Sequence, residues 1–347
     1  MSVPYLPLTI SQIKEEVPGV KTFVFGGGEA HSISYLPGQY LTLVAPTAQG
    51  EVRRSYSITS SPILGEPLTI GVKRIPNGIF SRRLVDEARE GEQVLTAGAA
   101  GLFVLPQEMD HVQQVFFWAA GSGITPIFSL LKTVLYAHPS VAVVLVYSNH
   151  DQHSTLFYRE LLQLESDFPD RLKILFLFSN SPRLDQARLH QDLLKRIVKE
   201  NAIAPLGKIV CYVCGPENYR RLCRYGLRAA GIPADNLRQE TFSTTKVPAR
   251  IAPPDTLPHL VSLLYQGVTR QIVPQYPDNI LLAARKAGIF LPYSCEAGRC
   301  GNCVARCLEG EVWMSYNEVL TQKDLDQGLV LTCVGHPVGG EVVLEIK

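Results

Sequence analysis

The chain has 347 residues, of which 46% are hydrophobic and 19% are charged, and its 33 basic and 32 acidic side chains give a formal net charge of +1. At about 150 residues per domain, this length predicts two or three domains. A charge near zero argues against nucleic-acid binding and against a polybasic membrane binder. The apolar runs are far shorter than the roughly 18 residues that span a bilayer, and Met1–Glu16 lacks the pattern of a signal peptide. We therefore expect a cytoplasmic protein without membrane insertion.

Residues 1–108 contain short apolar segments separated by glycine and proline turns. The clearest predicted strands are Tyr35–Val44, Ser55–Thr59 and Leu68–Lys73. Repeated short strands with such turns predict an antiparallel β-barrel.

Residues 109–243 alternate between buried strands and helices, which predicts a parallel, doubly wound α/β sheet. The expected strands are Val115–Ala120, Val141–Tyr147, Leu172–Phe178 and Lys208–Cys214. The expected helices are Pro126–Tyr136, Thr155–Glu165, Leu189–Glu200 and Asn218–Ala230.

Residues 244–258 hold four prolines and little periodic structure, which predicts a semi-rigid linker. In residues 259–347 we expect two short strands and a helix over Asp278–Ala287. Asp278 would be the N-cap of this helix and Gly288 would end it.

Five of the eight cysteines lie between positions 295 and 333. Four of these follow the C-x4-C-x2-C…C spacing of a plant-type [2Fe–2S] site: Cys295, Cys300, Cys303 and Cys333. Gly298 and Gly301 let the backbone wrap closely, so that its N–H groups can point at the sulfurs. A four-thiolate zinc site is the alternative, because spacing alone does not exclude it. Cys307 lies outside the pattern, and we expect it to be a small buried residue.

This segment, with the preceding Ile280–Gly288 helix and Leu291-Pro292-Tyr293, resembles plant-type ferredoxin. The resemblance covers residues 259–347 and implies an α+β domain with the β-grasp fold.

A flavin needs an aromatic face, a hydrogen-bond donor near its reactive nitrogen and cations for its phosphates. Tyr56, Ser57 and Arg54 supply these in the run Arg54-Ser55-Tyr56-Ser57, although an ordinary barrel strand could contain the same four residues. A second element, Gly71-Val72-Lys73 followed by Gly78-Ile79-Phe80-Ser81, would place backbone N–H groups and the Ser81 hydroxyl toward a pyrophosphate. A helix over Leu84–Ala88 would follow. The nearby cations Arg74, Arg82 and Arg83 are expected to be solvated surface charges.

A glycine-rich turn follows the predicted strand Val115–Ala120. Its residues are Gly121, Ser122, Gly123, Ile124, Thr125 and Pro126. The glycines permit close approach of a pyrophosphate, and Pro126 suits the first helical turn. Cys214-Gly215-Pro216 ends a later strand at the edge where doubly wound sheets bind ligands. Cys211 points to the opposite strand face from Cys214, so we expect a core residue there and no joint metal or redox pair.

In this order, the motifs resemble the ferredoxin–NADP reductase superfamily with a C-terminal plant-type ferredoxin domain. The chain is most similar in pattern to the reductase components of multicomponent oxygenases, of the phenylacetyl-CoA oxygenase reductase type. Tyr158-Arg159-Glu160-Leu161 and the Glu240–Phe242 ending fit that type. The resemblance implies three domains: an FAD-binding β-barrel, an NAD(P)-binding α/β domain and a [2Fe–2S] domain. Phthalate dioxygenase reductase shares this order but uses FMN, and the Gly78–Ser81 pattern favours FAD.

The resemblance also implies roles for single residues. Cys214 would lie beside the nicotinamide, Glu240 near the reacting atoms, and Phe242 over the second face of the flavin, with plain packing as the alternative for Phe242. Related reductases carry arginine where His150 stands and after a serine where Asn180 stands. The segment Tyr147-Ser148-Asn149-His150 would lie near the adenosine ribose. The two missing cations favour NADH over NADPH, although Arg183 could substitute and His150 could be protonated.

The implied activity is transfer of electrons from NAD(P)H through FAD and the [2Fe–2S] cluster to a one-electron acceptor, with Ser57, Cys214 and Glu240 at the site of hydride transfer. A terminal oxygenase is the expected protein partner. A fatty-acyl desaturase or another metalloprotein is an alternative acceptor. A non-catalytic NADH redox sensor is an alternative of another class, against which the intact flavin and nucleotide motifs count.

Overall fold

The structure is a computed structural model that describes residues 5–47, 50–243 and 252–346. It contains two compact units, one formed by Tyr5–Thr241 and one that begins at Phe242, and each is described by itself. Residues 1–4 of the N-terminal segment and 244–251 of the predicted linker lie outside the described residues. The domain boundaries at residues 108, 243 and 258 stay predictions. Within the described part of the chain, no helix is long and apolar enough to cross a membrane.

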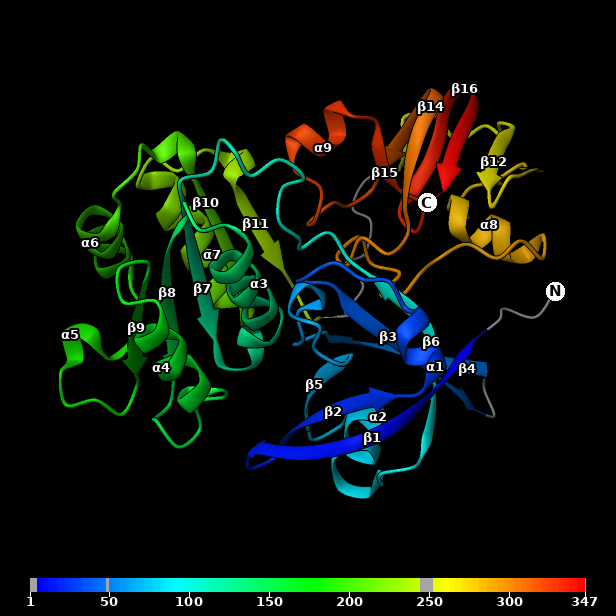
Figure 1. The fold of residues 1–347 in the computed structure, drawn as a ribbon. Helices are drawn as coiled ribbons and strands as arrows, with labels where there is room; N and C mark the ends of the chain where they lie inside the picture. Colours follow the sequence, from blue (N-terminus) through cyan, green and yellow to red (C-terminus); the bar gives the residue numbers. More distant parts are fainter. Residues whose placement is uncertain (1–4, 48–49, 244–251, 347) are drawn as a thin grey trace. The chain divides into compact units, whose positions relative to one another are not determined.

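The first unit begins with a six-stranded antiparallel sheet in the order β4-β3-β6-β1-β2-β5 (Figure 1). The strands are β1 (Leu6–Val17), β2 (Val20–Gly26), β3 (Tyr40–Thr47), β4 (Gly50–Ser57), β5 (Thr69–Lys73) and β6 (Gln93–Ala100). Its two edges meet where Ile58 pairs with Ile70 and Thr59 N–H donates to Thr69 O at 2.8 Å. The sheet is therefore closed at this corner, as the barrel prediction requires.

Strand β1 was not predicted, because its outward positions carry polar and charged side chains while Leu8 and Ile10 are fully buried. Strand β3 begins at Tyr40, later than the predicted Tyr35, because Gly38 makes a left-handed turn with φ +88°. A Cβ at Gly38 would lie 2.0 Å from the Phe103 carbonyl oxygen, so only glycine fits this turn.

The short helices of the barrel are α1 (Gly28–Ser32) and α2 (Ile79–Arg82). A π-helical turn, η2 (Arg83–Glu87), follows α2 directly. The predicted helix over Leu84–Ala88 is thus the second half of a longer helical segment, and Ala88 is already extended. Other single turns are the 3-10 helices η1 (Pro62–Leu64), η3 (Gly121–Gly123), η4 (Leu206–Lys208) and η5 (Ala234–Asn236).

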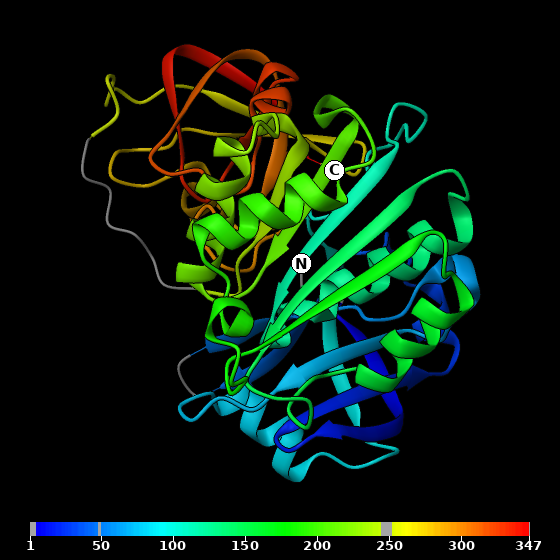
Figure 2. The same cartoon turned by 90° about the vertical axis from the view of Figure 1, so that its left-hand side faces the viewer.

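The second part of this unit is a parallel sheet in the order β11-β10-β7-β8-β9. Its strands are β7 (Gln114–Ala120), β8 (Ala142–Asn149), β9 (Leu172–Phe178), β10 (Ile209–Cys214) and β11 (Leu237–Glu240). The helices are α3 (Ile124–Ala137), α4 (Tyr158–Asp167), α5 (Leu184–Ala187), α6 (Gln191–Asn201) and α7 (Glu217–Ala229). Figure 2 shows helices on both faces of this sheet. The doubly wound prediction is confirmed.

The two faces of this sheet belong to separate cores. Buried residues of α3 and α4 pack against one face, and buried residues of α6 and α7 pack against the other. Cys214 belongs to the first core and Cys211 to the second. The strand geometry therefore separates the two thiols, as predicted.

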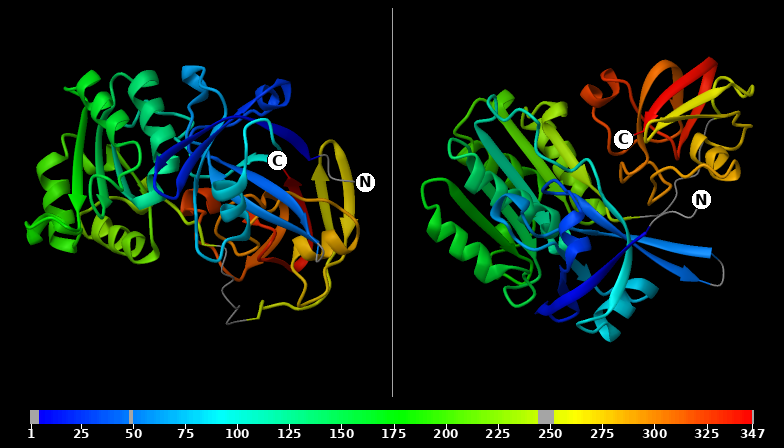
Figure 3. Two further views of the ribbon diagram at one scale, coloured as in Figure 1. Left: turned by 90° about the horizontal axis from the view of Figure 1, so that it is seen from below. Right: turned by 45° about the vertical axis from the view of Figure 1, so that its right-hand side comes forward.

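The C-terminal unit is a mixed sheet in the order β13-β12-β16-β14-β15 (Figure 3). Its elements are β12 (Val261–Tyr265), β13 (Val268–Ile272), α8 (Ile280–Lys286), β14 (Val304–Met314), α9 (Gln322–Asp326), β15 (Leu329–Leu331) and β16 (Gly335–Ile346). The prediction of two strands was wrong, because much of β13 and β14 is exposed and lacks an apolar pattern. The N-cap of α8 is Asn279, which accepts from Leu282 N–H, while Asp278 pairs with Lys286.

Candidate functional site

The glycine-rich turn lies at the carboxyl end of β7, the central strand of the parallel sheet. Every residue of β7 is buried, which fixes the position of this turn. Thr125 Oγ1 donates to Ser122 O at 2.9 Å, and the Tyr147 hydroxyl donates to Gly121 O at 3.0 Å. The turn then continues into α3, whose first residues, Ile124, Thr125 and Pro126, are buried beneath it. An anion above the turn would therefore meet Gly121 and Ser122.

Gly123 packs directly against the end of β10. A Cβ at this position would lie 2.1 Å from the Cys214 carbonyl oxygen and 2.8 Å from Gly215 N. Gly71 of the barrel is similarly tight against Thr125, with 2.7 Å to its Cγ2 atom. Gly123 thus allows close backbone packing against β10, and Gly71 leaves room for the Thr125 side chain.

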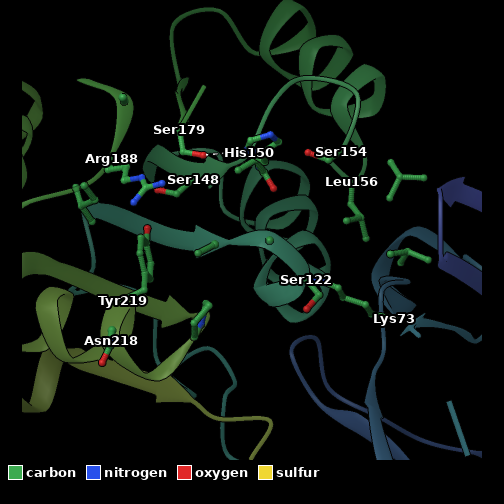
Figure 4. Close-up of a pocket in the computed structure, with 18 of the residues that line it drawn as sticks. Lys73, Ser122, Ser148, His150, Ser154, Leu156, Ser179, Arg188, Asn218 and Tyr219 are labelled. Atoms are coloured by element: carbon green, nitrogen blue, oxygen red, sulfur yellow. Dashed lines mark hydrogen bonds between the residues drawn. The ribbon is translucent and has the colours of Figure 1, made fainter. Parts of the chain in front are cut away.

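A cavity of about 690 Å³ opens beside the turn, within the size range of small-molecule sites. It is lined by Gly121, Ser122 and Pro216 of the predicted nucleotide motifs, by Ala120 at the end of β7, and by Val17, Pro18, Val20 and Lys73 of the barrel. Lys73 was predicted to serve the flavin, but the structure places it in this cavity, beside Ser122 (Figure 4). Ile124, Thr125, Cys214 and Gly215 do not line it.

Two buried hydroxyl groups of this cavity could form hydrogen bonds with a bound ligand. Ser148 Oγ and the Tyr219 hydroxyl lie next to each other, but neither makes a well-aligned hydrogen bond to a described residue. Buried polar atoms are nearly always hydrogen-bonded in folded proteins. A bound polar ligand would satisfy both groups, so the residues present fit a nicotinamide dinucleotide.

Arg188, Ser148, Ser179 and Tyr219 lie at the far end of the cavity, away from Ser122 and Lys73 (Figure 4). The sequence analysis missed three of them, Arg188, Ser179 and Tyr219. Arg188 follows the short helix α5, outside every motif, so no local spacing marks it. Arg183, the cation considered from sequence, does not line the cavity and pairs with Asp185 at 3.8 Å.

Cys214 and Glu240 end neighbouring parallel strands and are partners in register. Burial raises the pKa of Glu240 to about 8, and Glu240 Oε2 has no hydrogen-bond partner among the described residues. Burial, together with the nearby Glu240 carboxyl, raises the pKa of the Cys214 thiol well above its ordinary value. Both groups therefore carry their protons at neutral pH.

The predicted flavin residues come together at the end of β4. Arg54 and Tyr56 share one strand face, and the Arg54 charge acts on the Tyr56 hydroxyl. The Tyr56 and Phe80 rings lie 6.3 Å apart between centroids, so β4 meets α2. Ser57 is buried, with 4% of its surface exposed. An exposed cation beside a half-buried tyrosine fits a flavin and its phosphates.

Other predicted flavin contacts are less direct. Ser81 Oγ closes its own turn, since it accepts from Ile75 N–H and donates to Gly78 O, both at 3.3 Å. The Val72 and Phe80 side chains are in the barrel core. Phe242 is half exposed and begins the C-terminal unit, so its place at the flavin stays a prediction. Arg74, Arg82 and Arg83 are surface charges, as expected.

Helix α3 is anchored to the barrel loop that follows the flavin strand. Ser129 Oγ donates to Ser60 O at 2.6 Å, and the Ser61 and Thr133 hydroxyls are 2.8 Å apart. Lys132 Nζ lies 2.5 Å from Glu66 Oε2. These contacts tie the nucleotide turn to the flavin strand within one compact unit.

The four predicted ligand thiols form two pairs in the C-terminal unit. Cys295 is in hydrogen-bonding contact with Cys300, and Cys303 with Cys333. Among the described residues, no three acidic, cysteine or histidine side chains converge in the way that a single metal ion needs. Two thiols for each of two irons is the ligand arrangement of a [2Fe–2S] cluster, so the residues present fit this cluster better than one zinc ion.

The cluster loop directs backbone N–H groups at sulfur. Contact with Cys300 and the N–H groups of Arg299, Ala297 and Cys300 outweigh burial and lower the pKa of Cys295 to about 6. Arg299 is held by Glu318 at 3.1 Å. Cys307 is half-buried rather than enclosed, and its thiol donates to Glu309 O at 3.4 Å.

Three family models match successive parts of the chain. They are an oxidoreductase FAD-binding domain over residues 7–105, an oxidoreductase NAD-binding domain over 117–224 and a 2Fe-2S iron-sulfur cluster binding domain over 264–338. The chain is also 33% identical to the ferredoxin reductase component of 3-ketosteroid-9-alpha-monooxygenase from Mycolicibacterium smegmatis, with 97% of this chain and 96% of the relative covered. The chain belongs to the family of oxygenase reductase components.

Other members of this family support the assignment. One component of the 1,2-phenylacetyl-CoA epoxidase from Escherichia coli K12 is 31% identical, over 97% of this chain and 96% of its own length. Phthalate dioxygenase reductase has the same fold, with a TM-score of 0.60 and 24% identity over 99% of this chain and 98% of that structure. This oxygenase reductase component is therefore an oxidoreductase with FAD-, NAD- and [2Fe–2S]-binding parts, as the sequence predicted.

Proposed function

We propose that the chain takes electrons from NAD(P)H and delivers them singly to the terminal component of an oxygenase system. The observation that carries this proposal is the combination, in one chain, of an open nucleotide cavity bordered by the flavin barrel and two cysteine pairs that suit a [2Fe–2S] cluster. The relatives are named for oxygenases that act on different substrates, such as 3-ketosteroids and glycine betaine. The substrate is therefore expected to be set by the oxygenase, and the reductase to supply electrons.

When bound, FAD accepts two electrons as a hydride from NAD(P)H and the cluster passes electrons on one at a time. The chain itself supplies orientation. Arg54 would pair with the flavin phosphates, Tyr56 would cover one ring face, and Ser57 would donate a hydrogen bond to the reactive edge. Gly121 and Ser122 would hold the nucleotide pyrophosphate against the end of β7.

Cys214 and Glu240 would flank the nicotinamide at the ends of β10 and β11. Because both are uncharged at neutral pH, they would offer hydrogen-bonding groups without a buried negative charge near the hydride. A buried carboxylate would stabilise the positively charged, oxidised nicotinamide relative to the neutral, reduced nicotinamide. A neutral carboxyl group has a much weaker effect on this balance. We infer that these two residues position the ring.

The test uses purified chain loaded with FAD and reconstituted with iron and sulfide. We expect flavin and iron–sulfur bands in its visible spectrum and NAD(P)H-dependent reduction of cytochrome c. Cys300→Ser should abolish the cluster bands and most cytochrome c reduction while hydride transfer to the flavin persists. Cys307→Ser is the matched control and should keep both activities. Absence of flavin reduction by either nucleotide in loaded protein would refute the proposal.

The partner is tested by coupled turnover. Product formation by a candidate terminal oxygenase should require this chain and NAD(P)H, and should stop in the Cys300→Ser variant. If cytochrome c is reduced but every oxygenase tested stays inactive, while a desaturase turns over, the acceptor class is wrong and the electron-transfer order stands.

A further inference from the structure

We propose that Arg188 binds the 2′-phosphate of NADPH and that this chain therefore prefers NADPH over NADH. The inference rests on the proposed function and adds the choice of electron donor. It differs from the sequence expectation, which favoured NADH because arginine is missing at positions 150 and 180.

The cavity can accept negative charge at two places. In doubly wound sheets the pyrophosphate sits on the glycine turn, and the adenosine ribose extends toward the end of the neighbouring strand. Here the turn is at Gly121 and Ser122, with Lys73 beside it, and the neighbouring strand β8 ends with Ser148 and Asn149, directly before His150. Figure 4 places Arg188 at the β8 end, away from Ser122 and Lys73. The cavity thus has one cationic group for the pyrophosphate and another for the ribose.

The lining at the ribose end of the cavity has the residue types of an NADPH site. Proteins that prefer NADH usually bind the ribose 2′-hydroxyl through an aspartate or glutamate, whereas NADPH sites have arginine for the 2′-phosphate. The residues that line this cavity include no aspartate or glutamate. Asp151, which follows His150 in sequence, does not line the cavity: one carboxylate oxygen accepts from Ser154 N–H at 2.8 Å, and the other lies 3.9 Å from His150 Nε2.

Arg188 is available to bind an anion. Its side chain is exposed, and no ion pair joins it to a carboxylate of any residue that the structure describes. Arg183, five residues earlier, is paired with Asp185 and lies outside the cavity. A guanidinium without an anionic partner, next to the unsatisfied Ser148 and Tyr219 hydroxyls, makes a charged and hydrogen-bonding subsite for phosphate oxygens.

Neighbouring groups add to this subsite. Ser179 Oγ is 3.2 Å from His150 Nδ1, and both residues line the cavity. The hydroxyl and the imidazole can donate to a phosphate, while the ribose hydroxyl of NADH would leave Arg188 without an anion. We therefore expect Arg188 to discriminate between the two nucleotides rather than to strengthen both equally.

Binding is measured on the FAD-loaded chain with 2′-phospho-AMP and with AMP as probes. A charge-assisted contact with arginine predicts that 2′-phospho-AMP binds at least ~10-fold more tightly than AMP. Arg188→Ala should remove this difference, and Arg188→Lys should restore part of it because it keeps the charge but loses the planar fork. Arg183→Ala is the matched control and should change neither affinity.

Kinetics provide the second readout. In Arg188→Ala we expect the KM for NADPH to rise ~10-fold or more with little change in kcat, and the KM for NADH to stay the same. The inference would be overturned if the wild type bound both probes with equal affinity. It would also be overturned if the variant raised the KM for NADH and the KM for NADPH by the same factor. Flavin reduction by NADH alone would also overturn it and leave the proposed function intact, whereas reduction by neither nucleotide would be a failure of the proposed function.

Discussion

Cys214 and Glu240 stand side by side in register at the carboxyl ends of β10 and β11, with only 1% and 8% of their surfaces exposed. Neither is stabilised as an anion: the pKa of each is raised by burial, to about 8 in the case of Glu240. The edge of the sheet where ligands bind therefore ends in two buried, protonated groups.

Glu240 should make the stability of the protein depend on pH. Its folded-state pKa is above its ordinary value of 4.5, so the folded chain holds a proton that the unfolded chain releases between pH 4.5 and 8. The free energy of unfolding should fall through this window by up to ~1.4 kcal/mol per pH unit. Glu240→Gln should remove that slope, measured by urea unfolding at several pH values. Glu217→Gln, on the exposed start of α7, should keep the wild-type slope.

Gly123 should be intolerant of any side chain. In Gly123→Ala the new methyl group would press on the Cys214 carbonyl at 2.1 Å, so β10 and the nucleotide turn must separate. We expect a loss of roughly 1–3 kcal/mol of stability and a raised KM for NAD(P)H. Gly207→Ala is the control, because nothing lies within 4 Å of a Cβ at that position. Equal stability of the two variants would show that Gly123 is not packed tightly against the Cys214 carbonyl.

The cysteine pairs predict the composition of the metal site. Iron and sulfide analysis of reconstituted protein should give about two irons per chain with little zinc. Cys303→Ser removes one member of the second pair and should lower the iron content and the visible absorbance. The same substitution at Cys307 should leave both unchanged, because that thiol donates to the Glu309 carbonyl outside the ligand set. One zinc per chain with no sulfide would contradict the assignment.

The parts predicted well from sequence are those fixed by local spacing. The ligand cysteines lie in one loop and in the later turn between β15 and β16, and Gly121–Gly123 follows the apolar run Val115–Ala120, so short-range pattern was sufficient. Strand β9 was predicted with its observed bounds because its seven residues are nearly all apolar.

The parts predicted poorly depend on tertiary contacts. Arg188 enters the cavity from a loop between α5 and α6, and no motif spacing relates it to Ser148. Lys73 follows a flavin-type motif but its side chain lies in the nucleotide cavity, because β5 borders both sites. Ser81 was expected to face a phosphate, and its hydroxyl instead closes the turn at Gly78. Tertiary packing decides which of several neighbours a side chain contacts, and the spacing of residues in the sequence does not contain this information.

Two ion pairs join the barrel to the nucleotide part of the first unit, and they should differ in strength. The Lys132 side chain is 9% exposed and lies 2.5 Å from Glu66 Oε2, while the Lys14 and Glu160 side chains are 52% and 41% exposed. Burial lowers the pKa of Lys132, and the hydrogen bond and negative charge of Glu66 oppose this shift. Glu66→Gln should therefore cost roughly 1–3 kcal/mol, whereas Glu160→Gln should cost less than about 1 kcal/mol.

The Lys132–Glu66 ion pair can also be tested for a role in positioning the nucleotide turn. Lys132 lies on α3, which begins directly after Gly123, so loosening the pair should slow NAD(P)H-dependent flavin reduction as well as lower stability. A double-mutant cycle of Glu66→Gln and Lys132→Met, followed by chemical unfolding and stopped-flow flavin reduction, separates the two effects. We expect a coupling energy at Lys132–Glu66 and almost none in the matching cycle of Lys14→Met and Glu160→Gln. Equal coupling in both cycles would mean that the buried pair adds no more than a surface contact does.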